Sequence, residues 1–269
     1  MKEKAANQVT SALEKRNEII ERLRGRRPVI FLDYDGTLTP TGEEASRGLL
    51  PENTRQLIRR LSEYWMVVII TGRPLNDARK LVGLDNLVYV GSHGLDMAGP
   101  EDSFHETPGN RFRPVLDKAE KEVREAIRHL ARVYLQRKPF SVAIHYRLAN
   151  KAVLPELEAR VDEVVAHYPE LIKIAEKEIF ELRPKNWNKG QALLHLLERF
   201  HIDGSCSVPI YIGDDPKNEG IFQAVADRGI GILVSGGDQR TTADYTVRDP
   251  NEVTIFLEQL LQLFRKTPV

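Results

Sequence analysis

At 269 residues the chain is long for a single domain and short for two full ones, so a core domain that carries a smaller inserted one fits best. The 39 Lys and Arg residues balance the 39 Asp and Glu residues, and a net charge of zero argues against bulk binding to nucleic acid or to a membrane surface. Cys206 is the only cysteine, which excludes an intrachain disulfide framework, and no stretch reaches the ~18–20 apolar residues of a membrane span, so we expect a soluble cytoplasmic protein.

The first predicted element is an amphipathic helix over residues 1–24. Apolar side chains recur there at helical spacing among charged ones: Val9, Leu13, Ile20 and Leu23. The sequence Arg-Gly-Arg-Arg-Pro at 24–28 then ends the helix. We assign residues 1–27 to an N-terminal helix and expect it to pack on the core or on a partner.

A repeated pattern follows, in which an apolar run ends abruptly in polar residues or glycine and a helical pattern begins. The runs occupy 29–32, 66–70, 87–90, 210–212 and 230–234. Continuous Val- and Ile-rich runs that alternate with helices indicate a Rossmann-like α/β domain with a parallel sheet covered on both faces. In such sheets ligands bind at the carboxyl ends of the strands, where all of these polar terminators are expected to meet.

The middle of the chain has a different pattern. We predict a long amphipathic helix, a strand, a second helix and two short strands, over 111–137, 140–147, 154–167, 172–174 and 178–182. We interpret residues 106–184 as an α+β cap domain that is inserted into a core formed by 28–105 and 185–269.

The most informative feature is Asp33-Tyr34-Asp35-Gly36-Thr37, which directly follows the apolar run 29–32. Two carboxylates one residue apart at the end of a buried strand repel each other and resist leaving water, so the pair needs a cation or a shared proton. Residues i and i+2 of an extended chain point the same way, so Asp33 and Asp35 can face one substrate. We therefore predict a nucleophile at Asp33 and a proton donor at Asp35.

Three further residues at the predicted sheet edge complete a phosphoryl-transfer site. Thr71 would donate a hydrogen bond to a phosphate oxygen, and Lys189 would offset charge on the phosphate and on Asp33. Asp214 would form a Mg²⁺ site with Asp33 and the backbone carbonyl of Asp35, because Mg²⁺ prefers carboxylate oxygens with water and substrate phosphate. Each residue alone has a structural explanation, such as a turn, a helix N-cap or a surface lysine. Their order and their common position after apolar runs favour the catalytic interpretation.

These ordered motifs resemble those of the haloacid-dehalogenase-type phosphatases. Three further stretches are similar to the trehalose-phosphatase family within that group: Gly91-Ser92-His93-Gly94, Val142 to Arg147, and Glu181-Leu182-Arg183-Pro184 through Asn188-Lys189-Gly190. The resemblance implies a Mg²⁺-dependent enzyme that hydrolyses trehalose 6-phosphate to trehalose and phosphate through an aspartyl-phosphate. It also implies a trehalose-6-phosphate synthase as a candidate partner.

The resemblance further implies which residues contact the substrate. Lys177 and Glu181 would bind glucose hydroxyls, while Arg147 would face the substrate from the cap. The complete set that it implies is Arg73, His93, Gly94, Arg147, Lys177, Glu181 and Arg183. Charged groups with bidentate geometry discriminate well among the many hydroxyls of a sugar, which makes this set chemically reasonable.

The fourth motif departs from the family pattern. That pattern resembles Gly-Asp-Asp-x-Thr-Asp-Glu, whereas residues 213–219 read Gly-Asp-Asp-Pro-Lys-Asn-Glu. Lys217 therefore replaces a threonine, and Asn218 replaces an acid. We expect Asp215 and Asn218 to contact the groups that bind the metal and not the metal itself. The side-chain carbonyl of Asn218 would hold a metal-bound water.

Two alternatives stay open on the sequence alone. The first keeps the chemistry and changes the substrate to another sugar phosphate, or makes the protein a phosphomutase. The second is a non-catalytic trehalose-6-phosphate-binding regulatory protein that docks through its N-terminal helix. The altered fourth motif is the support for this second alternative, and the five catalytic residues argue against it.

Overall fold

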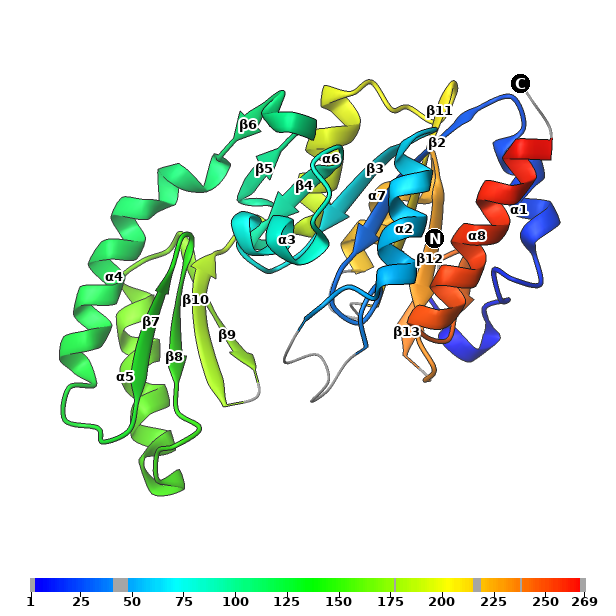
Figure 1. Cartoon of the computed structure of the whole chain (residues 1–269). Helices are drawn as coiled ribbons and strands as arrows, with labels where there is room; N and C mark the ends of the chain where they lie inside the picture. The colour runs from blue at the N-terminus through cyan, green and yellow to red at the C-terminus, as the bar shows by residue number, and fades with distance from the viewer. Residues whose placement is uncertain (1–2, 41–47, 177, 215–218, 238, 267–269) are drawn as a thin grey trace. The chain divides into compact units, whose positions relative to one another are not determined.

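The computed structural model describes residues 3–40, 48–176, 178–214, 219–237 and 239–266, and the chain divides into two compact units (Figure 1). Unit 1 comprises Met1–Glu106 and Asn188–Val269, and unit 2 comprises Thr107–Trp187. The sequence predicts an insert over 106–184, which nearly coincides with unit 2. Residues 1–27, predicted as a separate helix, fall within unit 1.

Unit 1 is built on a sheet with the strand order β14-β12-β11-β2-β3-β4-β5-β6 among the described residues. The parallel strands are β2 (Arg27–Asp33), β3 (Met66–Ile70), β4 (Val88–Gly91), β11 (Ser207–Gly213), β12 (Ile230–Val234) and β14 (Tyr245–Val247). Two short antiparallel strands, which the sequence did not predict, extend one edge: β5 (Asp96–Ala98) and β6 (His105–Glu106). The predicted Rossmann-like α/β class is confirmed.

Helices cover both faces of this sheet (Figure 1). Alternate strand residues such as Ile30, Leu32 and Ile69 form one buried cluster with apolar residues of α1 (Arg16–Leu23), α2 (Glu52–Ser62), α3 (Leu75–Val82) and α8 (Pro250–Lys266). Successive strand residues point to opposite faces, so Tyr211 points away from that cluster. It packs edge-on against Phe222 of α7 (Glu219–Ala226), which contacts α6 (Lys189–Arg199) on the second face.

The predicted helix over residues 1–24 is wrong in extent. Within its described part, residues 3–24, only α1 is α-helical. The chain before α1 contains the short strand β1 (Lys4–Ala5), paired with β13 (Arg240–Thr241), and a 3-10 turn at Ala6–Gln8. Residues just before α1 bond the edge strand β14: the Ala12 N–H donates to the Thr246 carbonyl at 2.8 Å, and the Thr246 N–H to the Thr10 carbonyl at 3.1 Å. An edge strand offers unpaired backbone groups, and satisfying them outweighs helical periodicity here. The expectation that this segment packs on the core is confirmed.

A polar network fixes α1 to the edge of the sheet. Arg22 donates from Nη2 to the Gly229 carbonyl at 2.7 Å and from Nη1 to the Tyr245 hydroxyl at 3.4 Å. The Tyr245 hydroxyl in turn donates to Glu18 at 2.8 Å. Burial raises the pKa of Tyr245, so the phenol stays protonated and can keep this donor role.

Unit 2 is an antiparallel sheet with two helices on one face. Its order is β7-β8-β10-β9, with β7 (Tyr134–Lys138), β8 (Ser141–His145), β10 (Ile179–Pro184) and β9 (Leu171–Glu176). Val142, Ile144, Phe180 and Leu182 point to one face and pack with apolar residues of α4 (Arg113–Ala126) and α5 (Leu154–Ala166).

The predicted helix over 111–137 is also wrong in extent. A 3-10 turn covers Pro108–Phe112, α4 ends at Ala126, and β7 takes residues 134–138. Arg132 adopts a left-handed conformation with φ of 61°, which is incompatible with a continuous helix. The residues after it pair with β8 in a tight hairpin, with Lys138 opposite Ser141. The second predicted helix, over 154–167, and the three predicted strands, over 140–147, 172–174 and 178–182, are confirmed within a few residues.

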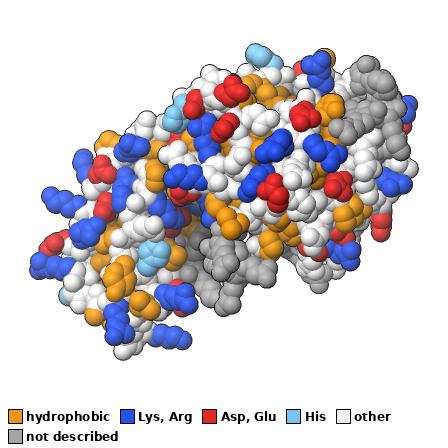
Figure 2. Space-filling view, viewed as in Figure 1, with side chains coloured by type: hydrophobic (Ala, Val, Ile, Leu, Met, Phe, Trp, Pro, Cys, Tyr) orange, Lys and Arg blue, Asp and Glu red, His pale blue; other side chains and the backbone are white. Residues whose placement is uncertain are grey.

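The surface agrees with the neutral composition. On the face shown in Figure 2, acidic and basic side chains of the described residues are interspersed. Among those residues, none of the helices combines the length and the apolar character that crossing a bilayer requires.

We expect Tyr245→Phe to lower the free energy of unfolding by about 1–2 kcal/mol, because Glu18 and Arg22 lose a shared, buried partner. Urea denaturation measures the change. Tyr134→Phe is the matched control, since this tyrosine is 55% exposed and should change stability by less than about 0.5 kcal/mol. Equal effects of the two substitutions would show that the network contributes nothing.

Candidate active site

The parallel register brings the predicted catalytic residues to one edge of the unit 1 sheet. Asp33 ends β2 and lies opposite Ile70, so Thr71 follows β3 at the same level. On the other side of β2, Leu32 lies opposite Ile212 of β11, so Asp214 leaves the sheet at that edge as well. Lys189 starts α6, whose N-cap Asn188 accepts a hydrogen bond from the Gln191 N–H at 3.0 Å.

Asp33 and Lys189 form a buried ion pair at the centre of this edge. The Lys189 Nζ lies 2.6 Å from Asp33 Oδ2, and the two residues are only 5% and 2% exposed. The other oxygen, Oδ1, accepts the Tyr34 N–H at 2.8 Å. A buried carboxylate is costly unless it is paired and hydrogen-bonded, and here it is both. Asp33 is therefore held as an anion in a fixed orientation.

Asp35 has a cation of its own. Arg73 Nε lies 2.9 Å from Asp35 Oδ2, and Arg73 Nη2 lies 2.5 Å from Oδ1. This contact differs from the sequence interpretation, which assigns Arg73 to the substrate. The hydrogen bond to Asp35 raises the pKa of Arg73, so the guanidinium stays charged. The repulsion between the two carboxylates is thus offset by two cations, one on each.

The loop after β3 holds the Thr71 hydroxyl so that its proton can be donated to an acceptor. Its oxygen accepts the Arg73 N–H at 3.1 Å, and Pro74, not Thr71, occupies the N-cap position of α3. The alternative explanation of Thr71 as the helix cap is therefore wrong. A hydroxyl that accepts in this way still has its own proton to donate. Thr71 is 1% exposed, so a donor at this position would act in a largely desolvated environment.

A strained segment lies beside that loop. Ser92, His93 and Gly94 have φ values of 51°, 56° and 102°, and left-handed conformations are costly for residues with a Cβ. Hydrogen bonds hold the segment: the Ser92 N–H donates to the Arg73 carbonyl at 2.7 Å and the His93 N–H to the Thr71 carbonyl at 3.0 Å. The imidazole of His93 packs on Gly72, where a Cβ would lie 2.6 Å from Cε1. His93 and Gly94 therefore adjoin the 71–73 loop, as expected for residues on the core side of the site.

The acidic residues at this edge offer only oxygen donors to a metal. Asp214 is half-buried, while Asp215, Lys217 and Asn218 lie outside the described residues. The described side chains contain no group of three or more His, Cys, Asp or Glu that could hold a metal. Two carboxylates and one backbone carbonyl, completed by water and phosphate, are a donor set that suits Mg²⁺. The residues at this edge therefore fit such an ion.

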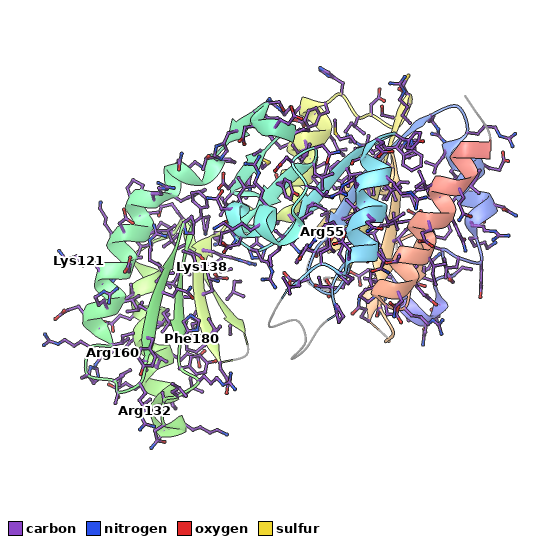
Figure 3. All side chains as sticks on the ribbon, viewed as in Figure 1. Arg55, Lys121, Arg132, Lys138, Arg160 and Phe180 are labelled. Atoms are coloured by element: carbon purple, nitrogen blue, oxygen red, sulfur yellow. The ribbon has the colours of Figure 1, made fainter. Side chains whose placement is uncertain are left out.

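In unit 2, Glu181 lies on the sheet face opposite the helices. Its neighbours Phe180 and Leu182 point to the helices, so Glu181 and Arg183 point the other way. Glu181 Oε1 accepts from the Lys138 Nζ and from the Ser141 hydroxyl, both at 2.7 Å. Figure 3 labels Lys138 on this sheet. Glu181 is 6% exposed, which makes it a buried, doubly bonded acceptor.

Sequence reasoning missed Lys138, because the predicted helix over 111–137 takes most of β7 and leaves Lys138 outside any element. It placed Ser141 in the predicted strand 140–147 but gave it no role in the site. The period-2 pattern of a strand would have placed Lys138, Ser141 and Glu181 on one face. On this face His145 also bonds Gln136 at 2.9 Å.

Arg147, another predicted residue of the insert, is placed differently. The Arg147 side chain is 80% exposed at the end of β8, with Nε 3.6 Å from Glu178 Oε2. Lys177 lies outside the described residues.

Comparisons with known proteins identify the group to which this arrangement belongs. A family model described as trehalose-phosphatase matches residues 31–251. The chain is 34% identical over 272 residues to the probable trehalose-phosphate phosphatase I of Arabidopsis thaliana, covering 96% of this chain and 74% of that protein.

Solved structures agree. A trehalose-6-phosphate phosphatase related protein is similar at 26% identity and a TM-score of 0.71, over 88% of this chain and 99% of that one. A haloacid dehalogenase-like hydrolase from Bacteroides thetaiotaomicron shares the fold at a TM-score of 0.63 and 17% identity, over 87% of this chain and 100% of that one. With the family model matching residues 31–251 of 269 and the Arabidopsis relative matching 96% of the chain, the chain belongs to the trehalose-phosphatase family.

Proposed function

We propose that the protein is a Mg²⁺-dependent phosphatase that hydrolyses trehalose 6-phosphate to trehalose and phosphate through an aspartyl-phosphate on Asp33. The observation that carries the proposal is the buried Asp33–Lys189 pair, with its 2.6 Å contact, at the edge where Thr71 and Asp214 directly follow their strands. Membership of the family supports the substrate.

Two displacements at phosphorus account for the reaction. In the first, an Asp33 carboxylate oxygen attacks phosphorus, the bond from phosphorus to the sugar oxygen breaks, and Asp35, which enters this step in its protonated form, transfers its proton to the sugar oxygen. Trehalose leaves. In the second, Asp35 takes a proton from water, the water oxygen attacks phosphorus, and the bond to Asp33 breaks. Phosphate leaves, and both side chains return to their starting state.

The surrounding groups lower the cost of bringing two anions together. Lys189 offsets charge on Asp33 and on the phosphate, while Thr71 donates to a phosphate oxygen. Asp33, Asp214 and the Asp35 carbonyl would hold Mg²⁺, which would supply further positive charge at the phosphate when bound. We assign Asp215 and Asn218 to supporting roles around that ion.

We assign sugar recognition to the open face of the unit 2 sheet. Glu181 is a buried acceptor beside the Lys138 ammonium. Buried polar groups of this kind bind a substrate that carries the matching hydroxyl much better than an analogue that lacks it. Arg147, Lys177 and Arg183 are proposed contacts from the same unit. His93 and Gly94 are proposed contacts from unit 1.

The cellular context follows from the same chemistry. A trehalose-6-phosphate synthase is the proposed partner, because its reaction would supply the substrate. A single cysteine, free and exposed at position 206, fits a reducing compartment, and we propose the cytoplasm.

Phosphate release from a panel of substrates tests the proposal as a whole. We expect strong preference for trehalose 6-phosphate over sucrose 6-phosphate, glucose 6-phosphate and p-nitrophenyl phosphate, and loss of activity on adding a chelator that excess Mg²⁺ reverses. Activity spread evenly over the panel would replace the proposed substrate with sugar phosphates in general. No release from any compound, together with measurable binding of trehalose 6-phosphate, would favour the regulatory alternative.

We expect Asp33→Asn to lower kcat by at least about 10³-fold, because the amide cannot attack phosphorus. The amide oxygen can still accept from Lys189, so circular dichroism should show a folded protein. The matched control is Asp117→Asn, whose carboxylate is 67% exposed in unit 2 and should leave kcat within about 2-fold. Turnover near that of the unchanged protein in Asp33→Asn would exclude Asp33 as the nucleophile.

We expect Glu181→Ala to lower kcat/KM for trehalose 6-phosphate by about 10²-fold and to change that for p-nitrophenyl phosphate by less than about 3-fold, since only the first substrate carries the hydroxyls. Steady-state kinetics on both substrates measure the ratio. Glu156→Ala, which removes an exposed carboxylate paired with His129, is the control. Equal losses on the two substrates would show that Glu181 does not recognise sugar.

A further inference from the structure

We propose that Arg73 is a positioning residue, which aims the Asp35 carboxylate, and not a contact to the sugar. The proposal rests on the proposed function, in which Asp35 is the proton donor. It replaces the role that the family resemblance gives Arg73.

The contact between Arg73 and Asp35 restrains both the position and the plane of the Asp35 carboxylate. Nε of Arg73 lies 2.9 Å from Oδ2 and 3.0 Å from Oδ1 of Asp35, and Nη2 lies 2.5 Å from Oδ1, so both carboxylate oxygens accept from the guanidinium. A planar guanidinium that bonds both oxygens holds the carboxylate in its own plane, which a single point charge cannot do. Asp35 has a side chain that is 43% exposed, so without this contact it would be free to rotate.

Arg73 is itself held by its surroundings. Its guanidinium carbon lies 5.7 Å from the centre of the Tyr34 ring. A Cβ on Gly48 would lie 2.8 Å from Nη2, so the backbone at Gly48 packs directly on the guanidinium. The Tyr34 hydroxyl donates to the Gly48 carbonyl at 2.5 Å. Tyr34 thus fixes both surfaces that Arg73 contacts.

Tyr34 is suited to this task. It lies between Asp33 and Asp35 in the sequence and its side chain is fully buried, which fixes the ring and its hydroxyl in place. The Arg73 backbone is held as well, because its N–H donates to Thr71 and its carbonyl accepts the Ser92 N–H. Residues 33–35, the 71–73 loop and Gly48 therefore all hold the Arg73 side chain in place.

This arrangement has a consequence specific to proton transfer. An acid that is aimed at the leaving oxygen accelerates departure of a poor leaving group, whereas a good leaving group departs without a proton. Loss of a residue that aims the acid should therefore penalise poor leaving groups selectively. A residue that binds sugar would penalise only sugar phosphates, and a residue that binds phosphate would penalise all substrates equally.

The test compares kcat/KM of the full-length protein and its Arg73→Ala variant on phenyl phosphate and p-nitrophenyl phosphate, neither of which carries a sugar. We expect a loss of about 10²-fold on phenyl phosphate and of less than about 5-fold on p-nitrophenyl phosphate. Arg73→Lys, which keeps the charge without the fork, should recover only part of the difference. Gly48→Ala, which pushes a methyl group into the guanidinium, should show the same selectivity.

Arg79→Ala is the matched control, because Arg79 also lies over a tyrosine ring, at 5.8 Å, and bonds an aspartate, Asp102, at 2.7 Å. It should affect both substrates equally.

The same kinetics on Asp35→Asn separate this proposal from the proposed function. Selective loss on phenyl phosphate in Asp35→Asn, with no further loss on adding Arg73→Ala, supports the positioning role. Selective loss in Asp35→Asn but uniform loss in Arg73→Ala overturns the role of Arg73 alone. Uniform loss in Asp35→Asn overturns the assignment of Asp35 as the acid, and the positioning role with it.

Discussion

The buried ion pair between Asp33 and Lys189 is the interaction on which the rest of this site depends. It joins the end of the central strand β2 to the start of α6, two elements that are separated by the whole of unit 2 in the sequence. Neither charge could stay buried alone, because desolvation of an unpaired ion costs several kcal/mol. The fold must therefore bring the two together, and in doing so it creates a desolvated carboxylate at the position that we propose for the nucleophile.

The two neighbouring carboxylates lie in different surroundings, which suits the two chemical roles that we propose for them. Asp33 is buried and paired with a lysine, whereas Asp35 is partly exposed and paired with an arginine. A lysine presents a compact charge, which can neutralise a nucleophile and a phosphate in turn. An arginine presents a rigid fork, which fixes orientation. Different cations thus give adjacent aspartates different environments within one short segment of chain.

The sequence by itself determined the fold class and the edge at which the chemistry lies. Continuous apolar runs such as 29–32 and 66–70 can be satisfied only inside a sheet that is covered on both faces, so they predict parallel strands. Polar residues that end such runs must meet at one edge, which is why Asp33, Thr71 and Asp214 could be grouped from the sequence. These inferences depend on local patterns, and local patterns are what a sequence displays.

Only the tertiary structure decided the extents of the first and fourth helices and the partners of the charged side chains. Residues 10–12 pair with an edge strand more than two hundred residues away, and residues 134–138 pair with the next strand. In both segments, hydrogen bonds that no local pattern reveals stabilise extended structure despite a helical pattern of apolar residues. In the same way, Arg73 bonds Asp35 and Lys138 bonds Glu181 because the folded chain leaves each carboxylate beside that cation. A sequence shows which charges exist, but the distances that decide their pairing are properties of the packed chain.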